Sequence, residues 1–201
     1  MYAGRFSRFF VNLLLGIDNM KKVILLSLLP LTAMAAPSLK GIVETYQDWD
    51  LICDNTGTCN MAGYPEYYSE HPVSILFTRS AGEKAPVTAQ LALLREDVGN
   101  KTAEIILNGQ SLGTVPNISE DGNAKLSEKQ TTELLTALKG NASIEVIFGE
   151  FKEKVSDKGA AAAMLKMDEF QQRLNTPSAL IRQGQEKHAV LAPKEIGRAH
   201  V

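Results

Sequence analysis

The stretch DWDLICDNTGTC, residues 48–59, decides how we expect the first half of the chain to fold. Its cysteines, Cys53 and Cys59, are the only two in the chain, and they enclose the turn-forming segment Asp54–Thr58. The alternating pattern of residues 45–53 predicts a first strand, and the residues that follow the second cysteine are expected to return beside it. We therefore expect a tight hairpin closed by a Cys53–Cys59 disulfide.

Two other roles for the cysteine pair are less well supported. A metal site needs further ligands, and His71 and His188 are the histidines that remain for it. A redox-active pair usually has the spacing Cys-x-x-Cys, which this pair does not have. A structural disulfide around so short a loop contributes roughly 2–3 kcal/mol to stability. We predict that the protein holds no metal ion and no cofactor.

The region from Met20 to Ala35 has the layout of a secretory signal peptide. Two lysines follow Met20, residues 23–31 form an apolar run, and Ala33 with Ala35 supplies the small-x-small pattern of a cleavage site. The apolar run is shorter than the roughly 20 residues that cross a bilayer. We expect cleavage between Ala35 and Ala36 and export to the periplasm, a compartment in which cysteine pairs are oxidised.

Both ends of the chain are expected to be artefacts. Residues 1–19 precede a complete signal, so we interpret them as an over-extended gene start. The last residues, EIGRAHV (195–201), can be encoded by a codon string that resembles an adapter of short-read sequencing libraries. The sequence therefore predicts a single exported β-rich domain over residues 36–194, truncated at its C-terminus.

The composition of residues 36–194 excludes two classes of partner. This segment is long enough for one domain with a hydrophobic core. It carries 16 Lys and Arg against 21 Asp and Glu, a net charge of −5, and it has no basic run. Because nucleic-acid binding depends on neutralising phosphates, this charge argues against it. No stretch of the segment is apolar enough to span a membrane, so we expect the mature protein to be soluble.

Strand patterns come first along the chain, and helix patterns come later. Asn108-Gly109 is a strong hairpin signal. Ser127 and Gln130 match a capping box that opens a helix ending near Gly140, and a second helix is expected over residues 158–174. Further strands are expected over residues 73–79, 87–95, 103–108, 110–115 and 143–149. The predicted class is α+β, mainly an antiparallel β sheet or sandwich with two packed helices.

The segment DWDLICDN, closed by Cys59, resembles the start of a family of bacterial periplasmic proteins of unknown function related to invasion-associated locus B proteins. The resemblance continues in the later helix, where the matching positions are Gly159, Asp168, Gln172 and Arg173. It implies an exported, disulfide-bonded and β-rich domain, and it implies no catalytic mechanism. Longer members continue into a second, cysteine-containing half. The link of locus B proteins to host-cell invasion extends to this chain only by analogy.

An aromatic group near the disulfide loop is the candidate binding patch, and it consists of Trp49, Tyr64, Tyr67 and Tyr68. Tyrosine and tryptophan are favoured at recognition surfaces. The alternative is that these rings only cover an edge of the core. The sequence leaves both interpretations open.

Polar residues that could support catalysis have simpler structural explanations. His71 stands outside any nucleophile motif. Asp48 and Asp50 are expected on a solvated face of the first strand. Glu169 and Arg173 are spaced as a local i,i+4 pair on the second helix. We therefore predict that the protein is not an enzyme.

These patterns favour a non-catalytic exported protein that binds an envelope or host component, either a protein or a small molecule. Two alternatives remain at this point. One is a periplasmic enzyme inhibitor similar to the lysozyme inhibitors, which are also small, exported, disulfide-bonded β domains. The other is an uncharacterised hydrolase.

Overall fold

The structure is a computed structural model that describes residues 39–93, 102–187 and 190–192. The expected signal peptide, the residues before it and the tail 195–201 lie outside the described residues, as does His188. The described residues belong to one compact unit, which contains all the elements below. No helix in the described part of the chain is both long and apolar enough to cross a membrane.

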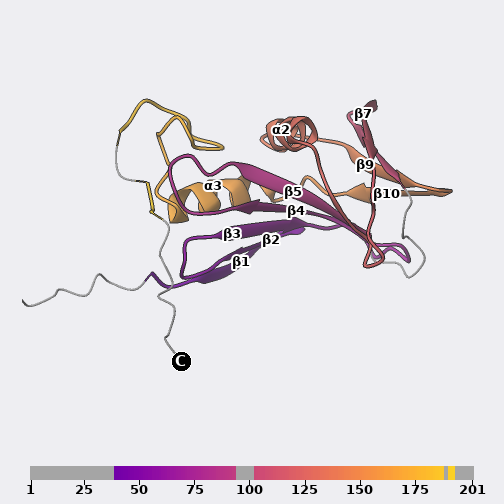
Figure 1. Cartoon of the computed structure of the whole chain (residues 1–201), viewed down its shortest axis with the longest axis horizontal. Helices are drawn as coiled ribbons and strands as arrows, with labels where there is room; N and C mark the ends of the chain where they lie inside the picture. The colour runs from indigo at the N-terminus through magenta and orange to yellow at the C-terminus, as the bar shows by residue number, and fades with distance from the viewer. Residues whose placement is uncertain (1–38, 94–101, 188–189, 193–201) are drawn as a thin grey trace, which may run out of the picture. The chain divides into compact units, whose positions relative to one another are not determined.

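The residues that the structure describes form two antiparallel sheets. The larger has six strands: β1 (Ile42–Tyr46), β2 (Trp49–Cys53), β3 (Cys59–Gly63), β4 (Val73–Arg79), β5 (Val87–Leu93) and β8 (Asn123–Lys125). Their order in space is β1-β2-β3-β4-β5-β8 (Figure 1). The hairpin from β2 to β3 places Cys53 opposite Cys59, and the two sulfurs are bonded. The predicted disulfide is therefore confirmed.

The smaller antiparallel sheet has four strands: β6 (Ala103–Leu107), β7 (Gln110–Val115), β9 (Ile144–Phe148) and β10 (Phe151–Val155). Their order is β10-β9-β6-β7. Asn108 and Gly109 connect β6 to β7, and both have a positive φ, 51° and 80°. A two-residue type I′ hairpin requires positive φ at both positions, so the hairpin signal is confirmed.

In the described residues, two helices pack on the sheets: α2 (Glu128–Ala137) and α3 (Ala160–Phe170). Helix α3 lies against β1, β2 and β3, and α2 lies against β5. Ser127 opens α2 with the predicted capping box: its Oγ accepts from the backbone N of Gln130 at 3.2 Å, and its own N donates to Oε1 of Gln130 at 3.0 Å. The α+β class with two packed helices is confirmed.

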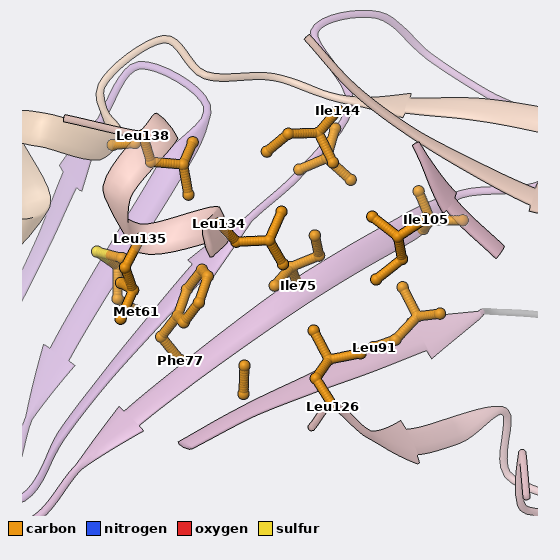
Figure 2. Close-up of a cluster of buried hydrophobic side chains, with 14 of the residues drawn as sticks. Met61, Ile75, Phe77, Leu91, Ile105, Leu126, Leu134, Leu135, Leu138 and Ile144 are labelled. Carbon is orange, nitrogen blue, oxygen red and sulfur yellow. The ribbon is translucent and has the colours of Figure 1, made fainter. Parts of the chain in front are cut away.

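The core lies between the inner face of the larger sheet, the smaller sheet and the helices (Figure 2). Leucines of α2, among them Leu134, point toward Ile75 and Phe77 of β4. Buried and half-buried residues alternate along β4, as expected of a strand with one face in the core. Burial of each large apolar side chain contributes roughly 1.5–3 kcal/mol, so this core supplies most of the driving force for folding.

The structure departs from the sequence prediction in three places. The predicted first strand is two strands, because the chain turns at Gln47 with a φ of 53°. Asp48 therefore lies in a turn and does not share a strand face with Asp50. Strands β8 and β10 lack a predictive pattern, since one has three residues and the other alternates lysine with glutamate. Helix α3 ends at Phe170, so Arg173 is not helical.

Position 159, one of the family-like positions, needs a glycine because the backbone of Tyr46 lies close to it at the start of α3. Its φ is +96°, and a Cβ built on it would lie 1.8 Å from the carbonyl oxygen of Tyr46. We expect Gly159→Ala to lower the free energy of unfolding by about 2–4 kcal/mol, because left-handed strain and overpacking each cost about 1–3 kcal/mol. Urea denaturation measures this loss.

Gly109→Ala is the matched control. Its φ is +80°, but no atom lies within 4 Å of a Cβ at this position. Its expected cost is only about 1 kcal/mol, from the backbone conformation alone. Equal losses in the two variants would show that the contact with Tyr46 does not constrain Gly159.

Candidate functional site

Trp49 belongs to the core and not to an exposed patch. Its side chain is fully buried, its ring stacks on Phe77 with centroids 6.0 Å apart, and its Nε1 donates to the carbonyl of Ser156 at 2.9 Å. A Cβ on Gly63 would meet the indole ring at 2.3 Å, so a glycine is needed opposite Trp49. The expectation that Trp49 forms part of a binding surface is therefore wrong.

The three tyrosines of the candidate patch are exposed, and they lie in the tyrosine loop, which we define as residues 64–69 after β3. The exposed fraction is 40% for Tyr64, 77% for Tyr67 and 94% for Tyr68. Tyr67 and Tyr68 are therefore largely free of the core, whereas Tyr64 is more than half covered.

Backbone hydrogen bonds on both sides of Tyr64 hold the start of the tyrosine loop in place. The backbone N of Tyr64 donates to the carbonyl of Asp48 at 3.1 Å, and the carbonyl of Tyr64 accepts from the N of Ser156 at 2.9 Å. Burial, together with the charge and hydrogen bond of Asp50, raises the pKa of the Tyr64 hydroxyl. Tyr64 therefore stays neutral through the physiological pH range.

The middle of the tyrosine loop is fixed by an ion pair. Glu66 contacts Lys158, which immediately precedes the glycine at the start of α3. Hydrogen bonds from Lys158 and from the hydroxyl of Tyr67 lower the pKa of the Glu66 carboxyl. The side chain of Tyr67 is nevertheless largely exposed.

A surface hollow of about 600 Å³ adjoins the tyrosine loop. One wall comes from the loop, with Tyr67 and Tyr68. The opposite wall comes from β9 and β10, where Lys152 and Lys154 lie 2.7 and 3.8 Å from the carboxylate of Glu145. The hollow therefore combines two aromatic rings with alternating charged groups.

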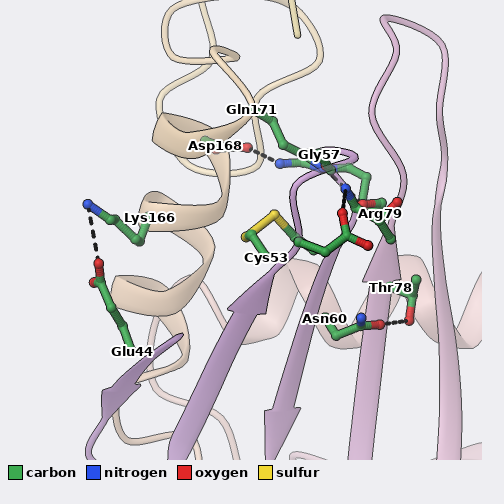
Figure 3. The surroundings of a disulfide bond; sticks show 12 residues. Glu44, Cys53, Gly57, Asn60, Thr78, Arg79, Lys166, Asp168 and Gln171 are labelled. Carbon is green, nitrogen blue, oxygen red and sulfur yellow. Dashed lines mark hydrogen bonds and ion pairs between the residues drawn. A yellow bond between two sulfur atoms is a disulfide. The ribbon is translucent and has the colours of Figure 1, made fainter. Parts of the chain in front are cut away.

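The family-like residue Asp168 forms a buried ion pair with Arg79 (Figure 3). Nη2 of Arg79, at the end of β4, lies 2.7 Å from Oδ1 of Asp168 on α3, and the two side chains are 2% and 0% exposed. Nε of Arg79 donates to Oε1 of Gln171 at 2.6 Å. The amide of Gln171 then donates to the carbonyls of Gly57 at 2.7 Å and of Arg79 at 2.9 Å.

The second oxygen of Asp168 binds the chain that follows α3. Oδ2 accepts from the backbone N of Leu180 at 2.7 Å and of Ile181 at 3.0 Å. Burial lowers the pKa of Arg79, and the charge and hydrogen bond of Asp168 act in the opposite direction. Both oxygens of Asp168 are thus engaged in structural bonds, and neither is available as a general base.

Arg173 and Gln172 have positions that differ from those expected. Arg173 is buried, and its guanidinium donates to the carbonyls of Glu83 at 3.2 Å and of Gly82. Burial, followed by the charge of Arg79, lowers the pKa of Arg173 to about 10. Gln172 is exposed in the turn after the helix with a φ of 56°. The expected Glu169–Arg173 support is replaced by a contact of Glu169 with Lys166 at 3.2 Å.

The other polar candidates are engaged separately and do not converge. Asp48 accepts from the hydroxyl of Ser156 at 2.6 Å, and Asp50 accepts from the hydroxyl of Thr45 at 2.6 Å. The ring of His71 packs edge-on against Phe151 with centroids 4.1 Å apart. In the described ranges, no group of three or more His, Cys, Asp or Glu side chains is placed to hold a metal ion.

A second groove, of about 740 Å³, lies where β5, β7 and β8 meet the start of α2. Its walls include Val87, Leu112 and Leu126. The side-chain amide of Gln130 on α2 donates to the carbonyls of Leu112 and Thr114 at 3.4 and 3.3 Å. This amide is therefore bonded to β7. None of the site residues proposed from the sequence lines this groove, although Ser127 and Gln130 of the predicted capping box do.

Comparison with known proteins gives a family and a solved structure of low similarity. The family model described as protein of unknown function, DUF1176, matches residues 43–199. The crystal structure of invasion-associated protein B from Bartonella henselae is similar at a TM-score of 0.46 and 14% identity, over 65% of this chain and 99% of that chain. No curated protein matches this chain. The resemblance expected from the sequence is confirmed at the level of an unknown-function family.

We expect Arg79→Met to lower the free energy of unfolding by about 3–5 kcal/mol, because it leaves the carboxylate of Asp168 buried without its cation. Urea denaturation monitored by Trp49 fluorescence measures the loss. The double variant Arg79→Met/Asp168→Asn removes the charge but keeps an oxygen for the backbone N–H groups of Leu180 and Ile181. It should therefore be more stable than the single variant. A loss below about 1 kcal/mol in Arg79→Met would contradict a structural role for the pair.

Proposed function

The chain belongs to the DUF1176 family of unknown function, and we propose that it is a non-catalytic binding protein that uses the tyrosine loop as its contact surface. The observation that carries the proposal is the exposure of Tyr67 and Tyr68, at 77% and 94%, beside a hollow of about 600 Å³. Tyrosine is enriched at binding hot spots because it combines a large apolar surface with a polar hydroxyl.

The anchoring of the tyrosine loop supports a binding role. Backbone bonds fix the loop at Tyr64, and the Glu66–Lys158 pair fixes its middle. A loop that is already ordered loses less conformational entropy on association than a free one. A tyrosine ring also has only two side-chain torsions to restrict, so its immobilisation is inexpensive in free energy.

The charges of the hollow indicate the chemistry of the partner. Lys152 and Lys154 share the carboxylate of Glu145, and Glu153 lies in the same wall. These groups supply donors and acceptors without a strong net field. A protein surface or a polar envelope component fits such a wall better than a polyanion does. The proposed partner is therefore an envelope or host component of mixed polarity.

The proposed compartment is the periplasm. The signal-like segment 20–35 and the paired cysteines both favour an exported protein, because disulfides persist in oxidising compartments. In this setting the binding surface would face soluble and membrane-anchored components of the envelope. A role toward a host would require further release from the cell.

Replacing the three loop tyrosines should abolish partner binding and leave the fold intact. We expect Tyr64→Ala/Tyr67→Ala/Tyr68→Ala to capture a periplasmic partner at least about 30-fold less well than wild type, since hot-spot residues contribute about 2 kcal/mol or more. Capture from periplasmic extract, identification by mass spectrometry and titration of the purified partner give this ratio.

The matched control replaces the same tyrosines by phenylalanine, which keeps the rings and removes the hydroxyls. It should retain most of the affinity if ring contact dominates. Equal capture by wild type and the triple alanine variant would exclude the tyrosine loop as the contact surface. Lysozyme inhibition, measured with the same variants, separates an enzyme inhibitor from other binding proteins.

The exported protein should begin at Ala36. Expression of residues 20–194 in a Gram-negative host should yield a periplasmic protein that has lost the segment before Ala36-Pro37, because Ala33 and Ala35 form the cleavage pattern. Intact mass and N-terminal sequencing of the periplasmic fraction test this. Retention in the cytoplasm, or a protein that keeps Met20, would contradict the proposed compartment.

A further inference from the structure

Strand β1 has a free edge in the described part of the larger sheet. It is the first strand in the order β1-β2-β3-β4-β5-β8, and its neighbour is β2. The β1–β2 hairpin closes through the pair Tyr46–Trp49, with two residues between them. Because hydrogen-bonded and non-bonded pairs alternate from such a turn, the backbone groups of Val43 and Thr45 point to the free edge.

The outer face at this edge carries an exposed apolar pair beside the polar pair Thr45–Asp50. Val43 is 75% exposed and Ile52 is 48% exposed, and the two residues lie directly opposite each other on β1 and β2. Proteins commonly protect a free strand edge with lysine, proline or a bulge. The sequence of β1, IVETY, contains no lysine or proline, and its register with β2 is continuous.

We infer that the free edge of β1 pairs with β1 of a second copy of this chain, in antiparallel register about a two-fold axis at Val43. The two sheets then continue through the interface. Val43 pairs with Val43 of the other copy, and residue 41 pairs with residue 45. The apolar row Ile52–Val43 of one copy is joined to the same row of the other copy.

The charges on β1 favour this register over the one with the two-fold axis at Glu44. If the axis passed through Glu44, the two Glu44 carboxylates would lie directly opposite each other, which is unfavourable. With the axis at Val43, Glu44 lies opposite Ile42 of the second copy. The two Glu44 carboxylates are then only diagonal neighbours, and each is also diagonal to the exposed Lys40 of the other copy on the same face of the sheet. Within its own chain, Glu44 lies 3.6 Å from Lys166 of α3, so it remains neutralised in the dimer (Figure 3).

Helix α3 leaves room for the second copy. It lies against β1, β2 and β3, so its axis runs near β2. In the paired sheet the two β2 strands are three strand spacings apart, about 14 Å. Packed helices need only about 8–10 Å between their axes, so the two α3 helices do not collide. Because two five-residue strands bury less than a standard interface, we expect a weak, concentration-dependent dimer.

Cross-linking by an introduced cysteine tests the contact and its register. In the proposed register, the two Cα atoms of residue 43 are about 5.5 Å apart, within the range of a disulfide. The two Cα atoms of residue 45 are offset by four residues, about 13 Å, and are out of reach. We expect Val43→Cys to form a covalent dimer under mild oxidation at least tenfold faster than Thr45→Cys.

Non-reducing gel electrophoresis over a dilution series gives the two rates, with the native disulfide intact in both variants. Both positions lie on β1 and are exposed, so their thiols react comparably in the monomer. A dimer of Val43→Cys that forms faster at higher protein concentration supports the proposal. Equal rates for the two variants, faster cross-linking of Thr45→Cys, or no dimer at all overturns it.

Sedimentation of the protein without added cysteine gives an independent readout. We expect the sedimentation coefficient of wild type to rise with concentration up to the high-micromolar range, and that of Val43→Lys to remain monomeric. Thr88→Lys is the matched control, because Thr88 is exposed on the outer face of β5, away from the β1 edge. Self-association of Val43→Lys equal to that of wild type overturns the proposal.

Discussion

The buried ion pair between Arg79 and Asp168 is the interaction on which the rest of this structure depends, because it joins parts of the chain that are far apart in sequence. Arg79 ends a central strand, Asp168 lies on α3, and Gln171 extends the bond to the disulfide loop at Gly57. Asp168 also holds the chain at Leu180. Two charges are costly to bury, so their complete set of partners ties the ends of the domain together in one arrangement.

The candidate binding surface lies outside this network and depends on it indirectly. The network positions α3, whose start is at Gly159, and Lys158 just before it holds the tyrosine loop through Glu66. The exposed rings can therefore change without loss of the core, whereas Arg79 and Asp168 cannot. This separation of a rigid interior from a variable surface is typical of proteins whose function is recognition.

Sequence patterns predict the local elements of this fold well and its long-range contacts poorly. The disulfide, the capping box at Ser127 and the hairpin at Asn108 follow from short motifs whose cause is local. The roles of Arg79 and Gln171 depend on contacts with residues about 90 or more positions away, which no local pattern encodes. One signal was available: Arg79 continues the inward alternation of β4, where a charge requires a buried partner.

The aromatic residues near the disulfide loop were grouped together by the sequence, but the structure divides them between core and surface. Trp49 and the tyrosines are close together in the chain and similar in chemistry, so composition alone groups them. Their positions in the strands separate them. Trp49 is at an inward-facing position of β2, while Tyr67 and Tyr68 lie in the loop after β3. The turn at Gln47 determines which residues of β2 face the core. A positive φ at a residue other than glycine is difficult to predict from the sequence.

The burial of the disulfide has a consequence for the order of events during folding. Cys53 and Cys59 are 1% and 0% exposed, and the loop between them is bound by Gln171, 114 residues after Gly57. Because an oxidant needs access to the thiols, we expect the bond to close before α3 and Gln171 dock against this loop. Once α3 has docked, a reductant is excluded in the same way. The covalent bond then lasts as long as the noncovalent structure that covers it, and its lifetime is set by the rate of unfolding.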